Sequence, residues 1–428
     1  MRRTLVELGV PVVAGVLGVV ALGVWVGGWL RFPAVPDRPV SLEPVAEAAA
    51  SAATPPAGGA APSAVGAAPL GVGAGLAATP GAGAPAAAGG LVRAANLEVP
   101  PAEGLWPSFR GPNRDGISPE RVRLARSWPA QGPPVLWSLA LGEGYAAAAV
   151  RNGRVYVLDY DTAAQADTLR CFALADGREL WRQSYPVQIR RNHGISRTVP
   201  AVTDRHVVTI GPKLHVMCVD AVTGELKWRI NLVEEYGATV PEWYAGQCPL
   251  IVGDKVIIAT GGRALVVALD LETGRRVWQS PNPRGWAMTH SSLAPMTLGG
   301  EPTVVYCGSG GVAGISLRDG RILWETEQWF IRTAMVPTPV VLPGNRIFLS
   351  GGYNAGSLML QLERQGGNWT PRELFRLPPR VFGSDQQTPI FYEGYIYGVR
   401  PGGELVCIDL NGNERWSSGT TRRFGIGP

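Results

Sequence analysis

Histidine and cysteine offer the most reactive side chains in this sequence, and both are scarce, with four His and five Cys among 428 residues. Zinc and haem sites are usually built from such side chains at short spacings. Neither His-x-x-His nor Cys-x-x-Cys occurs around His193, His206, His215 or His290. We therefore expect no metal site, and we place His206 and His215 within strands as packing residues.

Carboxylates are the next candidates, because a calcium ion requires several converging oxygen ligands. The acidic residues outside turns that could converge, Glu143, Glu242 and Asp385, are few and dispersed. No residue can be given a chemical step, and no catalytic residue is predicted.

Arginine dominates the basic residues, because 36 of the 39 are Arg and only three are Lys. The net charge is +5, but no continuous basic stripe accompanies it, so we expect no nucleic-acid partner. The run Arg190-Arg191-Asn192-His193 could hold an anion or an acidic peptide, or could be a solvated loop.

The N-terminal quarter differs from the rest of the chain. Residues 8–30 carry no charge and are flanked by Arg2, Arg3 and Arg31, a length that crosses a bilayer as a helix. We predict a single transmembrane signal anchor there, rather than a cleaved signal, with residues 1–7 in the cytoplasm. Residues 31–104 are rich in Ala, Gly and Pro, and we predict a disordered linker. The remainder is then expected on the periplasmic side of the inner membrane.

From residue 105 onward the sequence repeats, and this repeat must supply the elements that position any site. Five segments share a strand, a small residue, a glycine turn and a Trp four residues after that glycine, as in Cys218 to Trp228. A degenerate copy ends near Phe375, and an isolated Leu136-Trp137 pair precedes the first copy. The Trp intervals are 44, 47, 50 and 46 residues, then 92 across the degenerate copy. A period near 47 fits four short strands, the size of one propeller blade.

The repeated Trp is expected to pack against the neighbouring blade, with its N–H bonded to a carbonyl there. A small residue opposite leaves room for this packing, and a repeated Asp closes the turn by accepting backbone N–H groups. The predicted docking residues are Trp137, Trp181, Trp228, Trp278, Trp324 and Trp416, with Asp220, Asp270 and Asp409 in the turns.

The alignment of the repeats also places three of the cysteines in different blades. Cys171, Cys218 and Cys407 occupy equivalent positions in different blades, so we predict buried free thiols. A Cys248–Cys307 pair stays open, although five cysteines leave at least one unpaired.

The segments from Cys218 to Trp228 and from Ala268 to Trp278 resemble the docking motif of pyrroloquinoline quinone (PQQ) repeat propellers. The leader Trp106-Pro-Ser-Phe-Arg-Gly-Pro-Asn-Arg-Asp-Gly-Ile-Ser is similar to the first segment of bacterial PQQ-like proteins related to the outer-membrane assembly lipoprotein BamB. The resemblance implies an all-β propeller over residues 105–428, in which an early strand at Leu136-Trp137 completes the last blade. Relatives usually close eight blades, whereas six units and this strand are visible here, so we expect a C-terminally truncated ring.

The resemblance also raises the possibility of an enzyme. PQQ-dependent dehydrogenases resemble one another in an adjacent Cys pair over the quinone and a calcium ion held by acidic and amide side chains. This sequence has no adjacent cysteines. We therefore expect a non-catalytic scaffold without a cofactor that binds a protein or peptide of the cell envelope. The alternative is a quinoprotein-like oxidoreductase with a divergent PQQ site.

Binding is expected where the chain passes from an outer Trp strand to the next inner strand, because these loops gather at one mouth of the channel. The candidates are Tyr145, Arg190, Arg191, His193, Arg197, Trp243, Tyr244, Gln247, Trp286, His290, Arg332, Asp385, Gln386 and Gln387.

Overall fold

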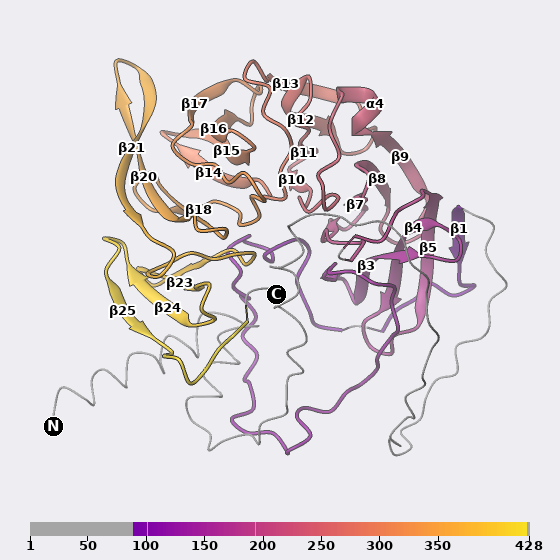
Figure 1. Cartoon of the computed structure of the whole chain (residues 1–428). Helices are drawn as coiled ribbons and strands as arrows, with labels where there is room; N and C mark the ends of the chain where they lie inside the picture. Colours follow the sequence, from indigo (N-terminus) through magenta and orange to yellow (C-terminus); the bar gives the residue numbers. More distant parts are fainter. Residues whose placement is uncertain (1–88, 101, 193, 426–428) are drawn as a thin grey trace, which may run out of the picture.

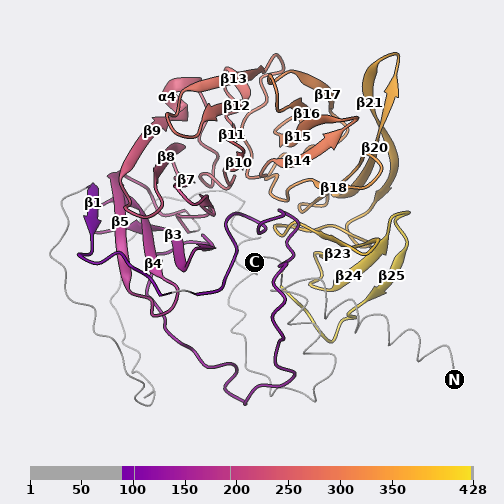
Figure 2. The ribbon, with the colours of Figure 1, turned by 180° about the vertical axis from the view of Figure 1, so that it is seen from behind.

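Six antiparallel β-sheets stand around a common centre in the computed structural model, which describes residues 89–100, 102–192 and 194–425. Figures 1 and 2 show them following one another around an arc in chain order. We call them blades 1 to 6, and the first strand of each blade is the innermost. The sequence predicted six four-stranded units, and the six sheets confirm that prediction.

The strands of the first three blades each form a simple meander. Blade 1 contains β2 (Ala149–Arg151), β3 (Arg154–Asp161), β4 (Ala166–Ala173) and β5 (Glu179–Pro186). Blade 2 contains β6 (Ala201–Val202), β7 (His206–Ile210), β8 (His215–Asp220) and β9 (Leu226–Asn231), followed by the short helix α4 (Leu232–Tyr236). Blade 3 contains β10 (Leu250–Val252), β11 (Lys255–Ala259), β12 (Ala264–Asp270) and β13 (Arg276–Pro281).

The other three blades repeat this order. Blade 4 contains β14 (Ala294–Leu298), β15 (Glu301–Gly308), β16 (Gly311–Ser316) and β17 (Ile322–Thr326). Blade 5, the degenerate copy, contains β18 (Val340–Leu342), β19 (Arg346–Gly351), β20 (Gly356–Gln365) and β21 (Asn368–Leu377). Blade 6 contains β22 (Ile390–Tyr392), β23 (Tyr395–Val399), β24 (Leu405–Asp409) and β25 (Glu414–Ser417).

Indole rings join the first four blades as the repeat predicts. The ring of Trp228 covers Gly274 in the turn of blade 3 so closely that a Cβ there would lie 2.7 Å from it. Its Nε1 donates to the carbonyl of Leu271, at 2.9 Å. The same ring-on-glycine contact joins Trp181 to Gly224. Such contacts bury one blade face against the next, which a single blade cannot do alone.

The predicted N–H bond forms in only part of the set, because Nε1 of Trp181, Trp324 and Trp416 has no hydrogen-bond partner among the described residues. Two further indoles donate as expected. Trp137 donates to the carbonyl of Leu174 at 2.8 Å, and Trp278 donates to that of Leu317 at 3.1 Å. In the degenerate blade 5, the ring of Phe375 covers the turn glycine of blade 6 in place of an indole.

The small residue predicted opposite each Trp is confirmed by the strand registers. The strand registers give the pairs Trp181 with Cys171, Trp228 with Cys218, Trp278 with Ala268, Trp324 with Gly314, and Trp416 with Cys407. The three cysteines in this set, together with Cys248 and Cys307, are buried free thiols. The Cys248–Cys307 pairing that the sequence left open is therefore absent.

The repeated aspartates close turns, as expected. Asp220 accepts the backbone N–H groups of Val222 and Thr223, and Asp409 accepts those of Asn411 and Asn413. Asp270 accepts the hydroxyl and the backbone N–H of Thr273, and these bonds hold the pKa of its carboxyl below the usual value.

Two expectations about the N-terminal part need correction. Strand β1 (Gly90–Arg93) lies inside the range given to a disordered linker, but it pairs with β5 as a fifth strand of blade 1. Its backbone groups complete the ladder at the outer edge of that sheet. Leu136-Trp137 was expected as an early strand of the last blade, but it has no strand pairing among the described residues.

The predicted anchor over residues 8–30 and the cytoplasmic residues 1–7 lie outside the described residues. Within the part of the chain that the structure describes, no helix is long and apolar enough to cross a membrane.

Candidate functional site

The loops that lead from one blade to the next lie on one face of the ring, beside the turns between the second and third strands. Ala245 donates its N–H to Pro212 in the turn of blade 2, and Ser309 in the turn of blade 4 donates to Ala287. This face is the mouth where the sequence placed the binding site.

Arginine and tyrosine meet over blade 1 on this face. The backbone N–H of Tyr145 donates to the carbonyl of Ser196, at 2.7 Å, and the guanidinium of Arg197 lies 5.4 Å from the centroid of the Tyr145 ring. Arg191 forms an exposed ion pair with Glu143, at 2.6 Å. The ring of Tyr145 is largely exposed, so the stacked pair is open to a partner.

Two aromatic residues extend this surface over blade 2. The hydroxyl of Tyr244 donates to the carbonyl of Arg190 at 2.6 Å, which joins the loops of blades 1 and 2. Asn192 donates to the carbonyl of Glu242 at 2.8 Å and strengthens the same connection. Trp243, half-buried, follows in the loop.

His290 completes the cluster from the loop between blades 3 and 4. Its ring centroid lies 6.2 Å from that of Trp243, and its backbone N–H donates to Met335. Burial and the nearby charge of Arg197 lower the pKa of His290 to about 4. The imidazole is therefore neutral near pH 7 beside Trp243. We call Tyr145, Arg190, Arg191, Arg197, Trp243, Tyr244 and His290 the mouth cluster.

The remaining predicted residues are placed elsewhere. Gln247 is fully buried, and its amide pairs with both backbone groups of Ala259. Trp286 is buried against blade 4, where the chain from Gly308 to Gly311 leaves room for its ring. His193 lies outside the described residues.

Four further candidates come from the loops that follow blades 4 and 5. Arg332 and Gln386 are exposed. Asp385 lies against Gly352, and Gln387 donates to the carbonyl of Val399.

The centre of the ring is occupied by the leader, a feature that the sequence did not predict. Trp106 forms a β-bridge with Val150 of blade 1, and Pro107 accepts the N–H of Val202 in blade 2. Residues 106–116, which we call the axial segment, continue toward blade 6 through the space inside the blades (Figure 1).

Two arginines hold the axial segment across the ring. Arg110 donates to the carbonyls of Thr388 and Pro389 at the start of blade 6, at 3.2 and 3.1 Å. Arg114 donates to the carbonyl of Ile251 in blade 3, at 2.6 Å. Burial lowers the pKa of Arg110 to about 10, so it stays charged near pH 7.

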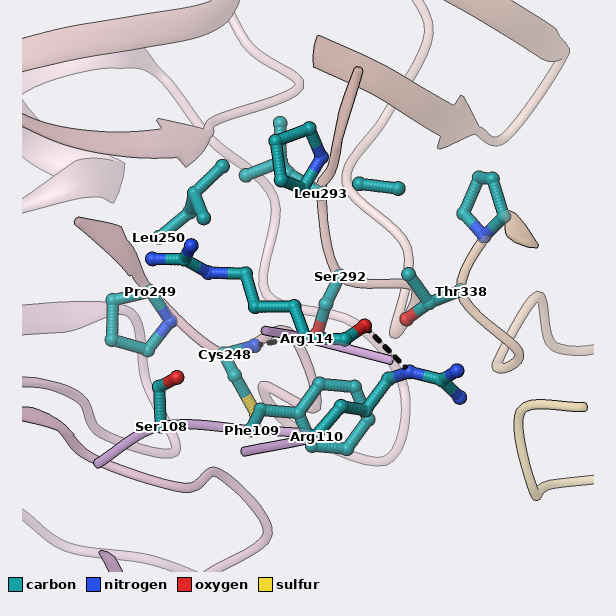
Figure 3. Close-up of a pocket in the computed structure, with 13 residues that line it drawn as sticks. Ser108, Phe109, Arg110, Arg114, Cys248, Pro249, Leu250, Ser292, Leu293 and Thr338 are labelled. Carbon is teal, nitrogen blue, oxygen red and sulfur yellow. Dashed lines mark hydrogen bonds between the residues drawn. The ribbon is translucent and has the colours of Figure 1, made fainter. Parts of the chain in front are cut away.

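A cavity of about 30 Å³ remains between the axial segment and the inner strands (Figure 3). Its walls include Phe109 of the segment, Leu250 of blade 3, Leu293 beside blade 4 and Thr338 beside blade 5. This volume holds about one or two water molecules. Among residues 89–100, 102–192 and 194–425, no three His, Cys, Asp or Glu side chains are grouped in a way that could hold a metal ion.

Radial four-stranded sheets joined by indole-on-glycine contacts define a β-propeller built from PQQ-like repeats. The family model of the outer membrane protein assembly factor BamB matches residues 165–418, and the chain belongs to this family.

Two relatives carry the name outer membrane protein assembly factor BamB. The protein from Bordetella pertussis is 24% identical over 207 residues, which are 48% of this chain and 47% of that protein. The one from Moranella endobia is 22% identical over 301 residues, 67% of this chain and 62% of that protein. The chain thus covers less than two thirds of the length of either relative.

Two solved structures were matched over part of this chain. BamB from Moraxella catarrhalis has 14% identity and a TM-score of 0.44, with 66% of this chain and 85% of that chain covered. Quinohemoprotein alcohol dehydrogenase from Comamonas testosteroni has 14% identity and a TM-score of 0.48, with 66% and 61% covered.

Proposed function

We propose that this propeller is a non-catalytic scaffold of the bacterial cell envelope that binds a protein or peptide through the mouth cluster. Membership of the BamB family supports a role in outer-membrane protein assembly. The predicted helix over residues 8–30 would tether the propeller to the inner membrane, with its bulk on the periplasmic side.

The convergence of Tyr, Trp and Arg side chains on one open face carries the proposal. Trp, Tyr and Arg are the residue types that most often dominate binding energy at protein interfaces. Here Arg197 stacks on Tyr145, and Tyr244 joins two loops while Trp243 stays partly accessible. The loops are thus held in place before a partner arrives, which reduces the entropy cost of binding.

The chemistry of the mouth cluster favours an extended, partly acidic polypeptide. Arg190 and Arg197 offer charge for carboxylates, while the half-buried ring of Trp243 offers an apolar surface. The axial segment fills the centre of the ring, so the accessible surface is the rim and not a deep pocket.

Capture from envelope extract tests this proposal. Purified full chain is cross-linked to extract and the captured proteins are identified by mass spectrometry. A defined envelope protein should be captured, and Trp243→Ala combined with Arg190→Ala should reduce its yield at least tenfold, because both hot-spot side chains are lost.

Trp128→Ala is the matched control, because Trp128 is an exposed Trp outside the mouth. The proposal would be wrong if the double variant captured the same protein in unchanged yield, or if the Trp128 variant lost it equally.

A further inference from the structure

The outer edge of blade 1 is covered by a strand from outside the blade. Strand β1 pairs antiparallel with β5, and Figures 1 and 2 show it beside β5. The pairs run from Gly90 with Ser184 to Arg93 with Trp181. The backbone groups of β5 at this edge are thus able to bind an extended segment of polypeptide.

Strand β1 covers this edge with few side-chain contacts. Strand β5 has eight residues and β1 has four, of which all but Leu91 are exposed. The ion pair of Arg93 with Glu225 is exposed on both sides, and such pairs contribute little to stability. Strand β1 is therefore held mainly by its backbone hydrogen bonds, which other extended segments can also form.

The residues that follow β1 are bound separately. Arg178 donates to the carbonyls of Asn96 and Glu98, at 2.7 and 2.8 Å. Arg154 donates to the carbonyl of Leu97, at 2.9 Å. Because these bonds do not involve β1, the strand can leave the edge while residues 96–98 stay in place.

One buried amide on this edge is not matched by β1. Gln183 of β5 is paired with Leu169 of β4 on one side and with Leu91 of β1 on the other, and it is 5% exposed. Its Oε1 has no hydrogen-bond partner among the described residues, and its Nε2 makes only a 3.4 Å bond to the carbonyl of Ser184. A buried polar group without a partner is costly, so a strand with a donor opposite Gln183 would fit this edge better than β1 does.

We propose that this edge binds an extended segment of a partner protein, which replaces β1 as an antiparallel strand and carries Asn or Gln at the position of Leu91. Backbone hydrogen bonds supply the affinity, and the amide opposite Gln183 supplies the specificity. A side-chain amide both donates and accepts, so the match holds for either orientation of the Gln183 amide.

Strand β1 then acts as an internal competitor that keeps the edge closed until the partner arrives. This edge contains no residue of the mouth cluster, so binding here is independent of the function proposed above.

Fluorescence anisotropy of two labelled peptides tests this binding. One peptide has the sequence of residues 89–95, and the other has the same sequence with Leu91→Asn. They are titrated with the full chain carrying Leu91→Pro, because proline in β1 weakens its pairing and frees the edge. The Asn peptide should bind this variant at least tenfold more tightly than the Leu peptide does. It should also bind the variant at least tenfold more tightly than the wild-type chain, where β1 competes at high effective concentration.

Gln183→Leu supplies the matched control, because it keeps the approximate size of the side chain and removes its amide. Combined with Leu91→Pro, it should remove the preference for the Asn peptide. A second measurement does not require a free edge. In an otherwise wild-type chain, Leu91→Asn should slow hydrogen exchange of residues 90–93 at least threefold, whereas Val92→Asn should not, because Val92 is 45% exposed and is paired with Arg182 instead.

The proposal is overturned if the folded Leu91→Pro chain binds neither peptide, if the two peptides bind equally, or if Gln183→Leu leaves their difference unchanged. If circular dichroism shows that the Leu91→Pro chain does not fold, unchanged exchange in the Leu91→Asn chain overturns it. A wild-type dimer that Leu91→Pro converts to monomer would show that β1 of a second copy occupies the edge, and would also overturn it.

Discussion

Replacement of Trp228 by Ala is expected to lower the free energy of unfolding by about 3–5 kcal/mol. The indole is 8% exposed, covers Gly274 and donates to the carbonyl of Leu271 at 2.9 Å. Alanine would leave a cavity between blades 2 and 3, and the buried carbonyl would lose its donor. The loss therefore combines a packing effect with a hydrogen-bond effect.

Urea unfolding followed by circular dichroism measures this change. Trp128→Ala is the control and should change the unfolding free energy by less than about 1 kcal/mol, because Trp128 is 43% exposed. Trp228→Phe should fall between the two, since it keeps a ring over Gly274 but loses the N–H donor. Equal effects of Trp228→Ala and Trp128→Ala would contradict the assignment of Trp228 to the contact between the blades.

The contribution of one buried carboxyl group, that of Asp167, to the free energy of unfolding should fall as the pH rises from about 4 to 7. Asp167 in β4 is 0% exposed and accepts the hydroxyl of Tyr185 at 2.7 Å, while its other oxygen has no partner among the described residues. Gly211 of blade 2 packs so closely on this pair that a Cβ would lie 1.9 Å from the Tyr185 oxygen. Burial raises the pKa of Asp167 to about 7.

The sign follows from proton counting. Between the unfolded pKa near 3.8 and the folded pKa near 7, the folded state binds more protons than the unfolded state. The contribution of Asp167 to the free energy of unfolding is thus complete below pH 3.8. It is lost as the pH rises through 7, and the total loss is on the order of 4 kcal/mol. Charged or titratable groups that face the pair include Asp159, Tyr160, His215 and Arg229.

Asp167→Asn isolates this contribution, because the amide keeps the shape of the side chain and does not titrate. Urea unfolding of both proteins is measured at pH 4.5, 6 and 8. The free energy of unfolding of the wild type should fall relative to that of the variant as the pH rises. Parallel pH profiles for the two proteins would show that Asp167 does not titrate in the folded state near neutral pH.

The repeat predicted the blades because its signals are local. A small residue, a glycine and a Trp at constant spacing determine the turn, the register and the blade face that is buried, as Cys218, Gly224 and Trp228 illustrate. The same local pattern predicted that Cys171, Cys218 and Cys407 are free and buried, which the structure confirms.

The candidate site was only partly predictable. Position in a loop indicates the face of the ring on which a residue lies, but not whether its side chain points outward. Trp286 turns inward because the glycines of blade 4 leave space for its ring, and Gln247 turns inward to the backbone of Ala259. Glycines make the space for Trp286, and main-chain atoms bind Gln247. Neither of these partners leaves a side-chain pattern that could be recognised in the sequence.

The axial segment was missed for a related reason. Arg110 binds the carbonyls of Thr388 and Pro389, which lie 278 and 279 residues away in the chain. Backbone acceptors at such a separation leave no spacing pattern to recognise. Strand β1 was missed likewise, since its partner β5 is known only once the blade exists.

Titration of the purified full chain with PQQ and calcium tests most directly whether this propeller is a binding scaffold or a quinone enzyme. We predict no calcium-dependent PQQ binding and no dye reduction, because Phe109 and Arg110 of the axial segment hold the centre of the ring and leave a cavity of about 30 Å³. Tight, calcium-dependent binding accompanied by dye reduction would contradict the account.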